Sequence, residues 1–144
     1  MKTVNIEVIK KHEGLELKAY LPTPHDVWTI GYGHTKGVKP GQAVTKEQAE
    51  VFLREDLVQA EGVVNAMVKV ELKQNQFDAL VSLVFNIGAG NFSKSSVLRF
   101  LNAGRYTDAA DSFRLWNKQR QGSKMVELQG LTKRRKEERE LFLK

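Results

Sequence analysis

Cysteine is absent from the 144-residue sequence, and histidine occurs only three times. Without thiols the chain can form neither a disulfide nor a cysteine-based metal site. The three histidines are scattered, which argues against a zinc centre. We therefore expect no metal and no cofactor.

Long apolar runs are also missing. No stretch approaches the roughly 20 residues that cross a bilayer, and residues 1–10 lack the apolar segment of a signal peptide. We expect a soluble protein with no stable membrane insertion and no export signal of its own.

The remaining composition is that of a globular protein, with 41% hydrophobic and 28% charged residues. The formal net charge of +6 favours an anionic partner: nucleic acid, an anionic membrane surface or an acidic polymer such as cell-wall material. A solvated basic surface without a partner is the plain alternative. Charge alone does not choose among these.

The strongest helix signal begins at Thr45, which forms a capping-box pattern with Gln48. Apolar residues then recur at helical spacing, which predicts one long helix over residues 46–67. The glycines, prolines and aromatics between residues 14 and 44 predict a small β-hairpin or meander. Further helices are expected over residues 4–13, 77–87, 95–103, 107–115 and 131–142, with Gly88, Gly90 and Asn91 ending the second of these.

This order of elements predicts an α+β fold in a single domain, residues 1–144. We expect a small N-terminal β-sheet lobe (about 14–44) packed on a larger helical lobe (about 73–144 plus helix 4–13). The helix 46–67 would connect the lobes, with a cleft between them.

Glu13 is the first candidate for chemistry. It follows Ile6 and Ile9 on the apolar stripe of the predicted helix 4–13, at the C-terminal end. Burial and the helix dipole both disfavour an ionised carboxylate there, which suits a general acid that must keep its proton. The alternative is a glutamate paired with an arginine.

The segment TIGYGHT, residues 29–35, is the second candidate. Two glycines within three residues indicate a close backbone approach, to either a packed helix or a ligand. Thr29 would expose its hydroxyl on one face of a strand. The GYG triplet is weak as a phosphate-binding signal, because the third glycine and a βαβ unit are missing.

Together these segments carry a resemblance. E-G-x-x-L-x-A-Y at residues 13–20, followed by W-T-I-G-Y-G-H-T at 28–35, resembles the phage-type lysozymes of glycoside hydrolase family 24. FDALVSLVFNIGAGNF and SSVLRFLNAGRYTDAADSFRLW, residues 77–92 and 95–116, are similar to the helical lobe of endolysins of lambdoid phages. GLTKRRKEERELF, residues 130–142, is similar to their C-terminal signature. The resemblance covers the whole chain.

The resemblance implies a lysozyme-like endolysin. Such a muramidase hydrolyses the bond between N-acetylmuramic acid and N-acetylglucosamine in bacterial peptidoglycan. The family's general acid falls on Glu13, and the threonine that helps to hold the attacking water falls on Thr29. The family's second carboxylate, nine residues after the acid, falls on Pro22, which has no ionisable group. Asp26 is the nearest carboxylate and is our default replacement, with His25 a weaker candidate. A turn-forming role for Asp26 is the alternative.

Two further patterns favour structural roles. His34 is expected to form an ion pair with Asp56, on the inner stripe of helix 46–67. Arg134 and Arg135 resemble an arginine pair behind the family's cleft, where one could reach Glu13. Otherwise the run KRRKEER is a charged, solvated helix with mixed i,i+4 pairs.

Other functions stay open at this point. A lytic transglycosylase would need Glu13 alone, and a catalytically weakened module would only bind the wall. A nucleic-acid binder is disfavoured because aromatic and basic residues are not interleaved. We expect a monomer that binds peptidoglycan glycan strands and no nucleic acid. It would remain in the host cytoplasm until lysis and then act on periplasmic peptidoglycan.

Overall fold

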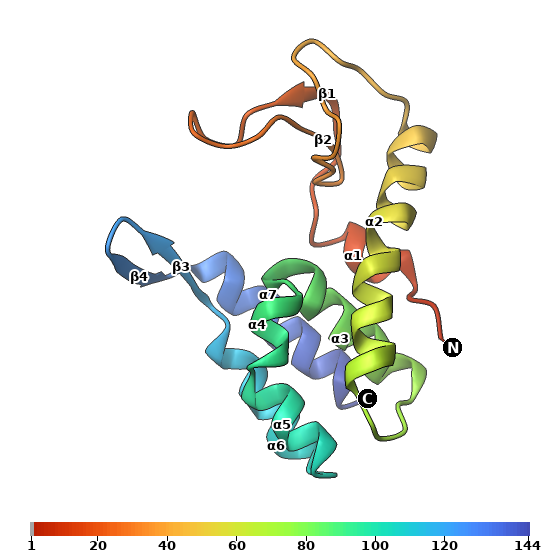
Figure 1. Ribbon diagram of the computed structural model, residues 1–144, viewed down its shortest axis with the longest axis vertical. Coiled ribbons are helices and arrows are strands. Elements are labelled where there is room, and N and C mark those ends of the chain that lie inside the picture. The colour runs from red at the N-terminus through yellow and green to blue at the C-terminus, as the bar shows by residue number, and fades with distance from the viewer. Residues whose placement is uncertain (1) are drawn as a thin grey trace. The chain divides into compact units, whose positions relative to one another are not determined.

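The computed structural model describes residues 2–144 and mixes helices with two small sheets (Figure 1). It divides into two compact units, which we call the N-terminal unit (residues 5–59) and the C-terminal unit (residues 2–4 with 60–144). The arrangement of two lobes within one domain stays a prediction. Each unit is described by itself.

The N-terminal unit begins with α1 (Ile6–Lys10), which is shorter than the predicted helix 4–13. The Asn5 side chain caps it by accepting a hydrogen bond from the Glu7 amide. Beyond Lys10, the amides of His12 and Glu13 still donate to the Ile9 carbonyl, at 3.0 and 3.1 Å. The chain thus continues from α1 into a hydrogen-bonded turn. The helix itself ends at Lys10, so the predicted C-terminal end at residue 13 is wrong by three residues.

Strands β1 (Glu16–Tyr20) and β2 (Thr29–Gly31) pair antiparallel, which confirms a hairpin in this region. Glu16 pairs with Gly31 and Tyr20 with Thr29, with an irregularity in the register between them. The strands are joined by the exposed turn that contains Pro22 and Asp26.

A tight turn follows β2. Ile30 and His34 exchange two backbone hydrogen bonds of 2.9 Å, so Gly31, Tyr32 and Gly33 form the turn. Gly31 and Gly33 have φ of 65° and 82°, a region that favours glycine. A Cβ on Gly31 would lie 3.1 Å from the Ala49 Cβ. Gly31 therefore lets the turn approach the helix that contains Ala49. Of the two predicted reasons for the glycine pair, a packed helix or a ligand, this contact is the packed helix.

The long helix α2 (Lys46–Met67) has the predicted bounds. Its N-terminus carries the predicted capping box, because the Thr45 amide donates to Gln48 Oε1 at 2.9 Å and the Gln48 amide to Thr45 Oγ1 at 3.1 Å. Residues 46–59 of this helix belong to the N-terminal unit and residues 60–67 to the C-terminal unit.

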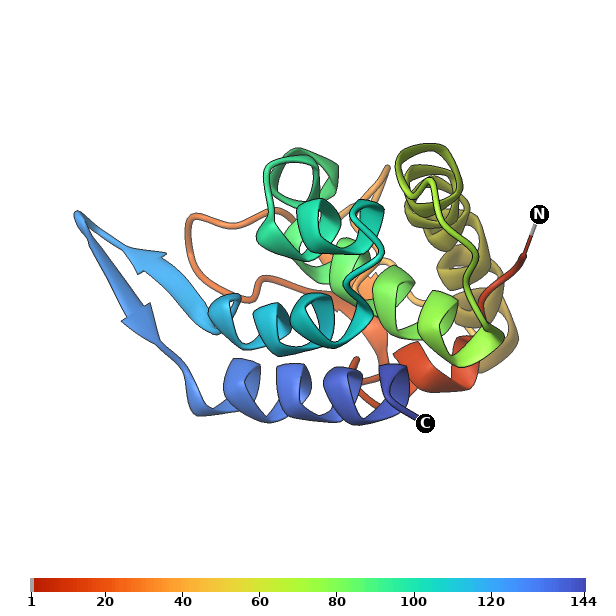
Figure 2. The same cartoon turned by 90° about the horizontal axis from the view of Figure 1, so that it is seen from below.

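The C-terminal unit is built around α3 (Gln74–Ile87), which packs against α7 (Gln129–Phe142) (Figures 1 and 2). Around this pair lie α4 (Ala89–Ser93), α5 (Ser96–Asn102), α6 (Tyr106–Ser112) and the 3₁₀ turn η1 (Phe113–Leu115). The fully buried core side chains include Phe77, Leu80, Leu83, Phe92, Leu101, Phe113 and Phe142. A buried central helix was predicted here and is confirmed. Within residues 2–144, no helix has the length and apolar character needed to cross a membrane.

Two details of this unit differ from the prediction. Gly88, with φ of 89°, does end α3, but Gly90 and Asn91 lie inside the short helix α4. A second hairpin, β3 (Lys118–Gln121) and β4 (Lys124–Glu127), was not predicted. Figures 1 and 2 show it extending away from the helices of this unit.

The helix α7 is not fully solvated, although its many charged residues had left a solvated helix open as one prediction. Arg134, Arg135 and Glu138 are buried, with exposed fractions of 7%, 1% and 1%. Glu138 contacts both arginines, at 3.2 Å to Arg134 Nε and 2.7 Å to Arg135 Nε, and accepts a hydrogen bond from the Ser82 hydroxyl. Arg135 also donates to Asn86 Oδ1 at 2.8 Å. Burial raises the pKa of Glu138, and the two arginine charges oppose that shift.

Candidate active site

Glu13 lies in the turn between α1 and β1 and is half-buried. Its carboxylate approaches the tight turn after β2, since a Cβ on Gly33 would be 3.9 Å from Glu13 Oε2. The structure therefore brings together the two segments that the sequence singled out, Glu13 and the glycine turn.

Thr29 starts β2, the strand that leads into this turn. It is buried, with 5% exposed, and its hydroxyl donates to the Val27 carbonyl at 3.0 Å. The expectation of an exposed hydroxyl is therefore wrong. Because the hydroxyl hydrogen is used in this bond, the oxygen keeps its acceptor capacity for a further donor such as a water.

Asp26 is an exposed residue of the β1–β2 turn. Its amide donates to the Thr23 carbonyl at 3.0 Å, and its Oδ1 accepts from the Val27 amide at 2.9 Å. These are the hydrogen bonds of a turn former. They occupy one carboxylate oxygen and leave Oδ2 outside the turn. His25 is also exposed.

Tyr20 is a residue that the sequence reasoning did not single out, although it closes the E-G-x-x-L-x-A-Y motif. Its pKa is raised by burial and, in decreasing order, by the charges of Glu16, Glu13 and Asp26. The phenol is therefore within electrostatic reach of the acid and of the default second carboxylate. It stays protonated at neutral pH and is able to donate a hydrogen bond.

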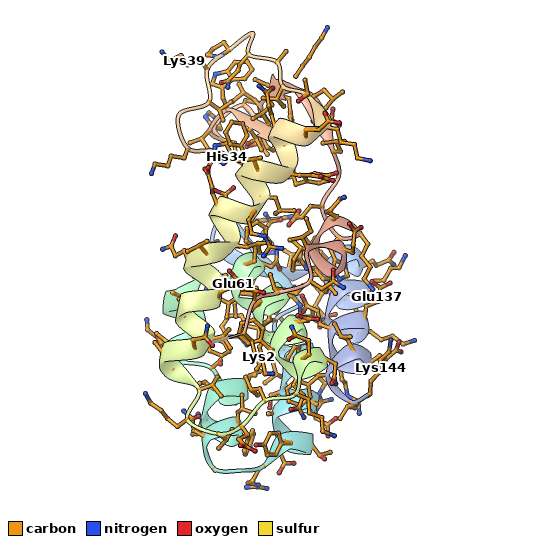
Figure 3. The ribbon with its side chains drawn as sticks, turned by 90° about the vertical axis from the view of Figure 1, so that its right-hand side faces the viewer. Lys2, His34, Lys39, Glu61, Glu137 and Lys144 are labelled. Atoms are coloured by element: carbon orange, nitrogen blue, oxygen red, sulfur yellow. The ribbon has the colours of Figure 1, made fainter. Side chains whose placement is uncertain are left out.

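His34, which closes the glycine turn, has the predicted structural role. Its Nδ1 lies 2.9 Å from Asp56 Oδ2, which confirms the predicted contact. Its ring stacks on Phe52 with centroids 4.3 Å apart. Figure 3 labels His34 on the turn that lies beside the first half of α2.

A second ionic contact fixes α1 on α2. Lys10 Nζ lies 2.6 Å from Glu50 Oε1 and 5.6 Å from the centre of the Tyr32 ring. The hydrogen bond to Glu50 raises the pKa of Lys10, and the same bond lowers the pKa of Glu50. Tyr32, the middle residue of the glycine turn, is buried with 4% exposed, so Lys10 contacts both α2 and this turn.

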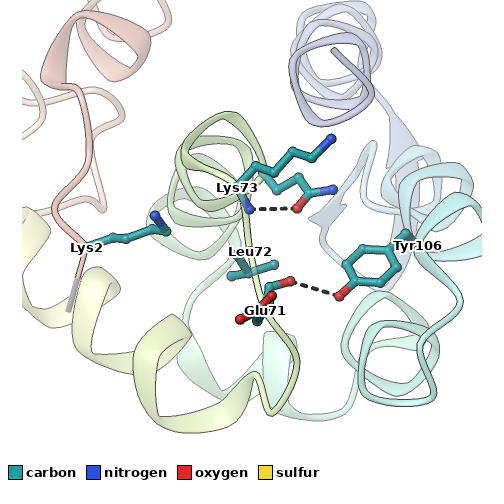
Figure 4. A pocket seen from close by; sticks show the side chains of 6 residues that line it. Lys2, Glu71, Leu72, Lys73 and Tyr106 are labelled. Carbon is teal, nitrogen blue, oxygen red and sulfur yellow. Dashed lines mark hydrogen bonds between the residues drawn. The ribbon is translucent and has the colours of Figure 1, made fainter.

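The C-terminal unit has two sizeable surface hollows, which none of the candidate catalytic residues lines. One, of about 710 Å³, lies where the Tyr106 hydroxyl donates to the Glu71 carbonyl at 2.8 Å (Figure 4). The other, of about 580 Å³, lies against the β3–β4 hairpin and is lined in part by Trp116, Asn86 and Arg120. Across residues 2–144 there is no group of three His, Asp or Glu side chains placed to hold a metal ion.

A protein-family model described as phage lysozyme matches residues 10–138. The chain belongs to the phage lysozyme family. An endolysin of Acyrthosiphon pisum secondary endosymbiont phage 1 is 48% identical over 135 residues, which cover 94% of this chain and 92% of that protein. The endolysin of Bacillus phage PZA is 48% identical over 139 residues, or 95% of this chain, but the match spans only 52% of that longer protein.

Solved structures agree with this family. The muramidase domain of SpmX from Asticaccaulis excentricus superposes with a TM-score of 0.94 at 41% identity, covering 100% of this chain and 99% of that one. The fold is therefore the α+β lysozyme fold, and the chain is a lysozyme-type glycoside hydrolase that acts on peptidoglycan.

Proposed function

We propose that this enzyme hydrolyses the bond between N-acetylmuramic acid and N-acetylglucosamine during host lysis, with Glu13 as the general acid. The observation that supports it most is the approach of Glu13 Oε2 to Gly33. The carboxylate lies beside the glycine turn, and the sequence resemblance assigns the family's acid to this residue. Glu13 would protonate the glycosidic oxygen as the bond to the muramic acid carbon breaks.

The second half of the reaction needs a water and a group to receive its proton. We assign these roles to Thr29, whose oxygen accepts a hydrogen bond from the water, and to Asp26, whose Oδ2 takes the proton. The water oxygen then forms the new bond to the sugar carbon. Atoms balance, because Glu13 loses one proton and Asp26 gains one, and solvent restores both groups.

A second candidate reaction is favoured by the exposed turn position of Asp26 and by its Oδ1 bond to the Val27 amide. If Asp26 takes no part, Glu13 would act first as acid and then as base, with the N-acetyl group of the substrate assisting. This is the lytic transglycosylase reaction, and its product carries an anhydro-muramic end instead of a reducing end.

The proposal also covers the oligomeric state, the partners and the location of the enzyme. We assign to the enzyme a monomeric state, glycan strands as its macromolecular partner, no nucleic acid and no stable membrane insertion. It would accumulate in the host cytoplasm and reach the periplasmic peptidoglycan at lysis. The net charge of +6 supports attraction to an anionic wall.

The test is a digestion of purified peptidoglycan in ¹⁸O-water, followed by mass spectrometry of the fragments. Hydrolysis adds one ¹⁸O at each new reducing end, whereas transglycosylation adds none and gives anhydro ends. Glu13→Gln should lower the rate by about 10²-fold or more, because the amide cannot donate the proton. The matched control is Glu47→Gln, an exposed carboxylate at the start of α2, which should keep the wild-type rate.

Each result has a clear reading. A Glu13→Gln enzyme that keeps more than about a tenth of the rate refutes Glu13 as the acid. Binding to the wall without release of any fragment by the wild type indicates a catalytically weakened binding module.

A further inference from the structure

We propose that Tyr20 is a positioning residue for hydrolysis: its phenol holds the attacking water between the Asp26 carboxylate and the Thr29 side of the hairpin. This inference rests on the proposed function above. It adds a third side chain to a site that lacks the family's carboxylate at position 22.

The strand register places Tyr20 correctly. Tyr20 pairs directly with Thr29 across the antiparallel hairpin. Side chains of directly opposed residues in such a pair lie on the same face of the sheet, with Cβ atoms about 4.5–5.5 Å apart. The phenol therefore rises from the same face as the residue that the resemblance assigns to the water.

The surroundings of Tyr20 contain the acidic groups that the reaction uses. The charges of Glu16, Glu13 and Asp26 all reach the phenol and, together with burial, raise its pKa. A phenol among carboxylates stays neutral and donates its hydrogen. Donated to the oxygen of the attacking water, this hydrogen fixes the orientation of a water whose own two hydrogens point to Asp26 and Thr29.

The Tyr20 hydroxyl is also available, unlike those of the other tyrosines. Tyr20 is 37% exposed, and its hydroxyl makes no hydrogen bond with any of residues 2–144. Tyr32 is buried at 4% exposed under Lys10, and the Tyr106 hydroxyl donates to the Glu71 carbonyl. A structural purpose for the Tyr20 hydroxyl is therefore not visible in the fold.

Pro22 stands where the family has its second carboxylate, and this gives Tyr20 its proposed role. A single carboxylate at position 22 would both hold the water and accept its proton. In this chain the base assigned is Asp26, on an exposed turn with Oδ1 engaged by the Val27 amide. A water held by such a turn alone would be poorly oriented. Tyr20 lies on the paired strand and supplies a fixed second contact.

The test compares Tyr20→Phe with wild type on purified peptidoglycan, with Tyr106→Phe as the matched loss of a tyrosine hydroxyl elsewhere. We expect Tyr20→Phe to lower kcat by about 10-fold, less than the roughly 10²-fold or more of a general acid or base, because the phenol orients the water and takes no proton from it. KM and Tm should stay at their wild-type values, because the ring remains and no hydrogen bond within the fold is lost. Tyr106→Phe should lower Tm and leave kcat unchanged.

A second measurement separates water positioning from a general loss of activity. Digestion in the presence of methanol gives methyl glycosides in competition with reducing ends. Loss of the oriented water should raise the ratio of methanolysis to hydrolysis at least about twofold in Tyr20→Phe, and not in Tyr106→Phe. This ratio is measurable even when turnover is slow.

Three outcomes overturn the proposal. They are an unchanged kcat, an effect on KM alone, which would indicate a ring that stacks on a sugar, and a lowered kcat with an unchanged product ratio. Failure of the proposed function is distinguishable, because then the wild type itself would release no ¹⁸O-labelled reducing ends.

Discussion

The imidazole of His34 lies flat against the ring of Phe52, with the centroids 4.3 Å apart and 6° between the ring planes. On its edge, Nδ1 is 2.9 Å from Asp56 Oδ2. One side chain thus joins the end of the glycine turn to α2 through both a stack and a hydrogen bond. Both contacts stabilise the packing of this turn on α2.

His34→Ala should lower the free energy of unfolding by about 1–3 kcal/mol, because a part-buried hydrogen bond and an aromatic stack are lost together. Urea denaturation measures this loss. Activity per folded molecule should survive, since the ring takes no part in the reaction. His25→Ala, at an exposed turn position, is the control and should leave stability unchanged. A His34 variant of wild-type stability with collapsed turnover would show that the structural role is wrong.

Asp26→Asn tests the second carboxylate. The amide oxygen of Asn can accept the Val27 hydrogen bond as the carboxylate does, so the turn and Tm should be preserved. If Asp26 is the base, kcat on purified peptidoglycan should fall by about 10²-fold, as for loss of a general base.

Pro22→Asp in the Asp26→Asn background is the matched rescue, because it restores a carboxylate at the family's position. It should recover part of the lost kcat and the ¹⁸O-labelled reducing ends. A silent Asp26→Asn substitution would instead leave Asp26 as a turn former and favour the transglycosylase products.

The Lys10–Glu50 contact predicts a defined dependence of stability on pH. Lys10 lowers the pKa of Glu50 below its ordinary value of 4.5. A carboxyl with a lowered folded pKa contributes stability that is complete above its unfolded pKa and is lost as the pH falls through the folded pKa. On the alkaline side, the raised pKa of Lys10 means that its contribution is complete below 10.5 and is lost above that value.

Melting temperatures of wild type and Glu50→Gln at about pH 7 and about pH 3 measure the acid side. The wild type should lose more Tm on acidification than the variant, because the variant has no Glu50 proton to take up. Glu47→Gln, on the exposed first turn of the same helix, should lose as much as wild type. Equal losses of Tm in Glu50→Gln and wild type would show that the Lys10–Glu50 contact does not contribute to the loss of stability in acid.

Glu138→Gln should destabilise the C-terminal unit by about 3–5 kcal/mol, because it removes the carboxylate charge from between two buried arginines. Differential scanning calorimetry or urea denaturation at neutral pH measures this. Glu140→Gln is the control on the exposed face of α7 and should change the free energy of unfolding by no more than about 0.5 kcal/mol. A neutral Glu138→Gln would show that the arginines are satisfied without it.

The elements that were predicted well are those whose signals are local. The capping box of Thr45 and Gln48 and the apolar spacing after it set both ends of α2. The β3–β4 hairpin was missed because its residues are polar and nearly all exposed, so no alternation marks the strands. Its one signal was Gly122 before Ser123, where a positive φ of 63° makes the two-residue turn.

Burial of charged groups was beyond local reasoning. In the run KRRKEER the face that α3 covers depends on a partner helix about 50 residues away, so both an arginine pair and a solvated helix stayed open for this run. At the candidate site, the sequence identified Glu13 and Thr29 through motif spacing. Tyr20 was not singled out because its pairing with Thr29 depends on the strand register, which is irregular between Glu16 and Tyr20.

The chain order of the two units has a consequence for biosynthesis. Val4 is buried, and its amide donates to Glu61 Oε2 at 2.6 Å, so residues 2–4 are part of the C-terminal unit. That unit is discontinuous in sequence, and the N-terminal unit is inserted into it after its first residues. On the ribosome the inserted unit is complete before its host, whose opening residues must wait for their hydrogen-bond partners Glu61 and Gln74 to emerge. A tag fused before the opening residues would therefore disturb the unit made last, and would leave the unit that carries Glu13 untouched.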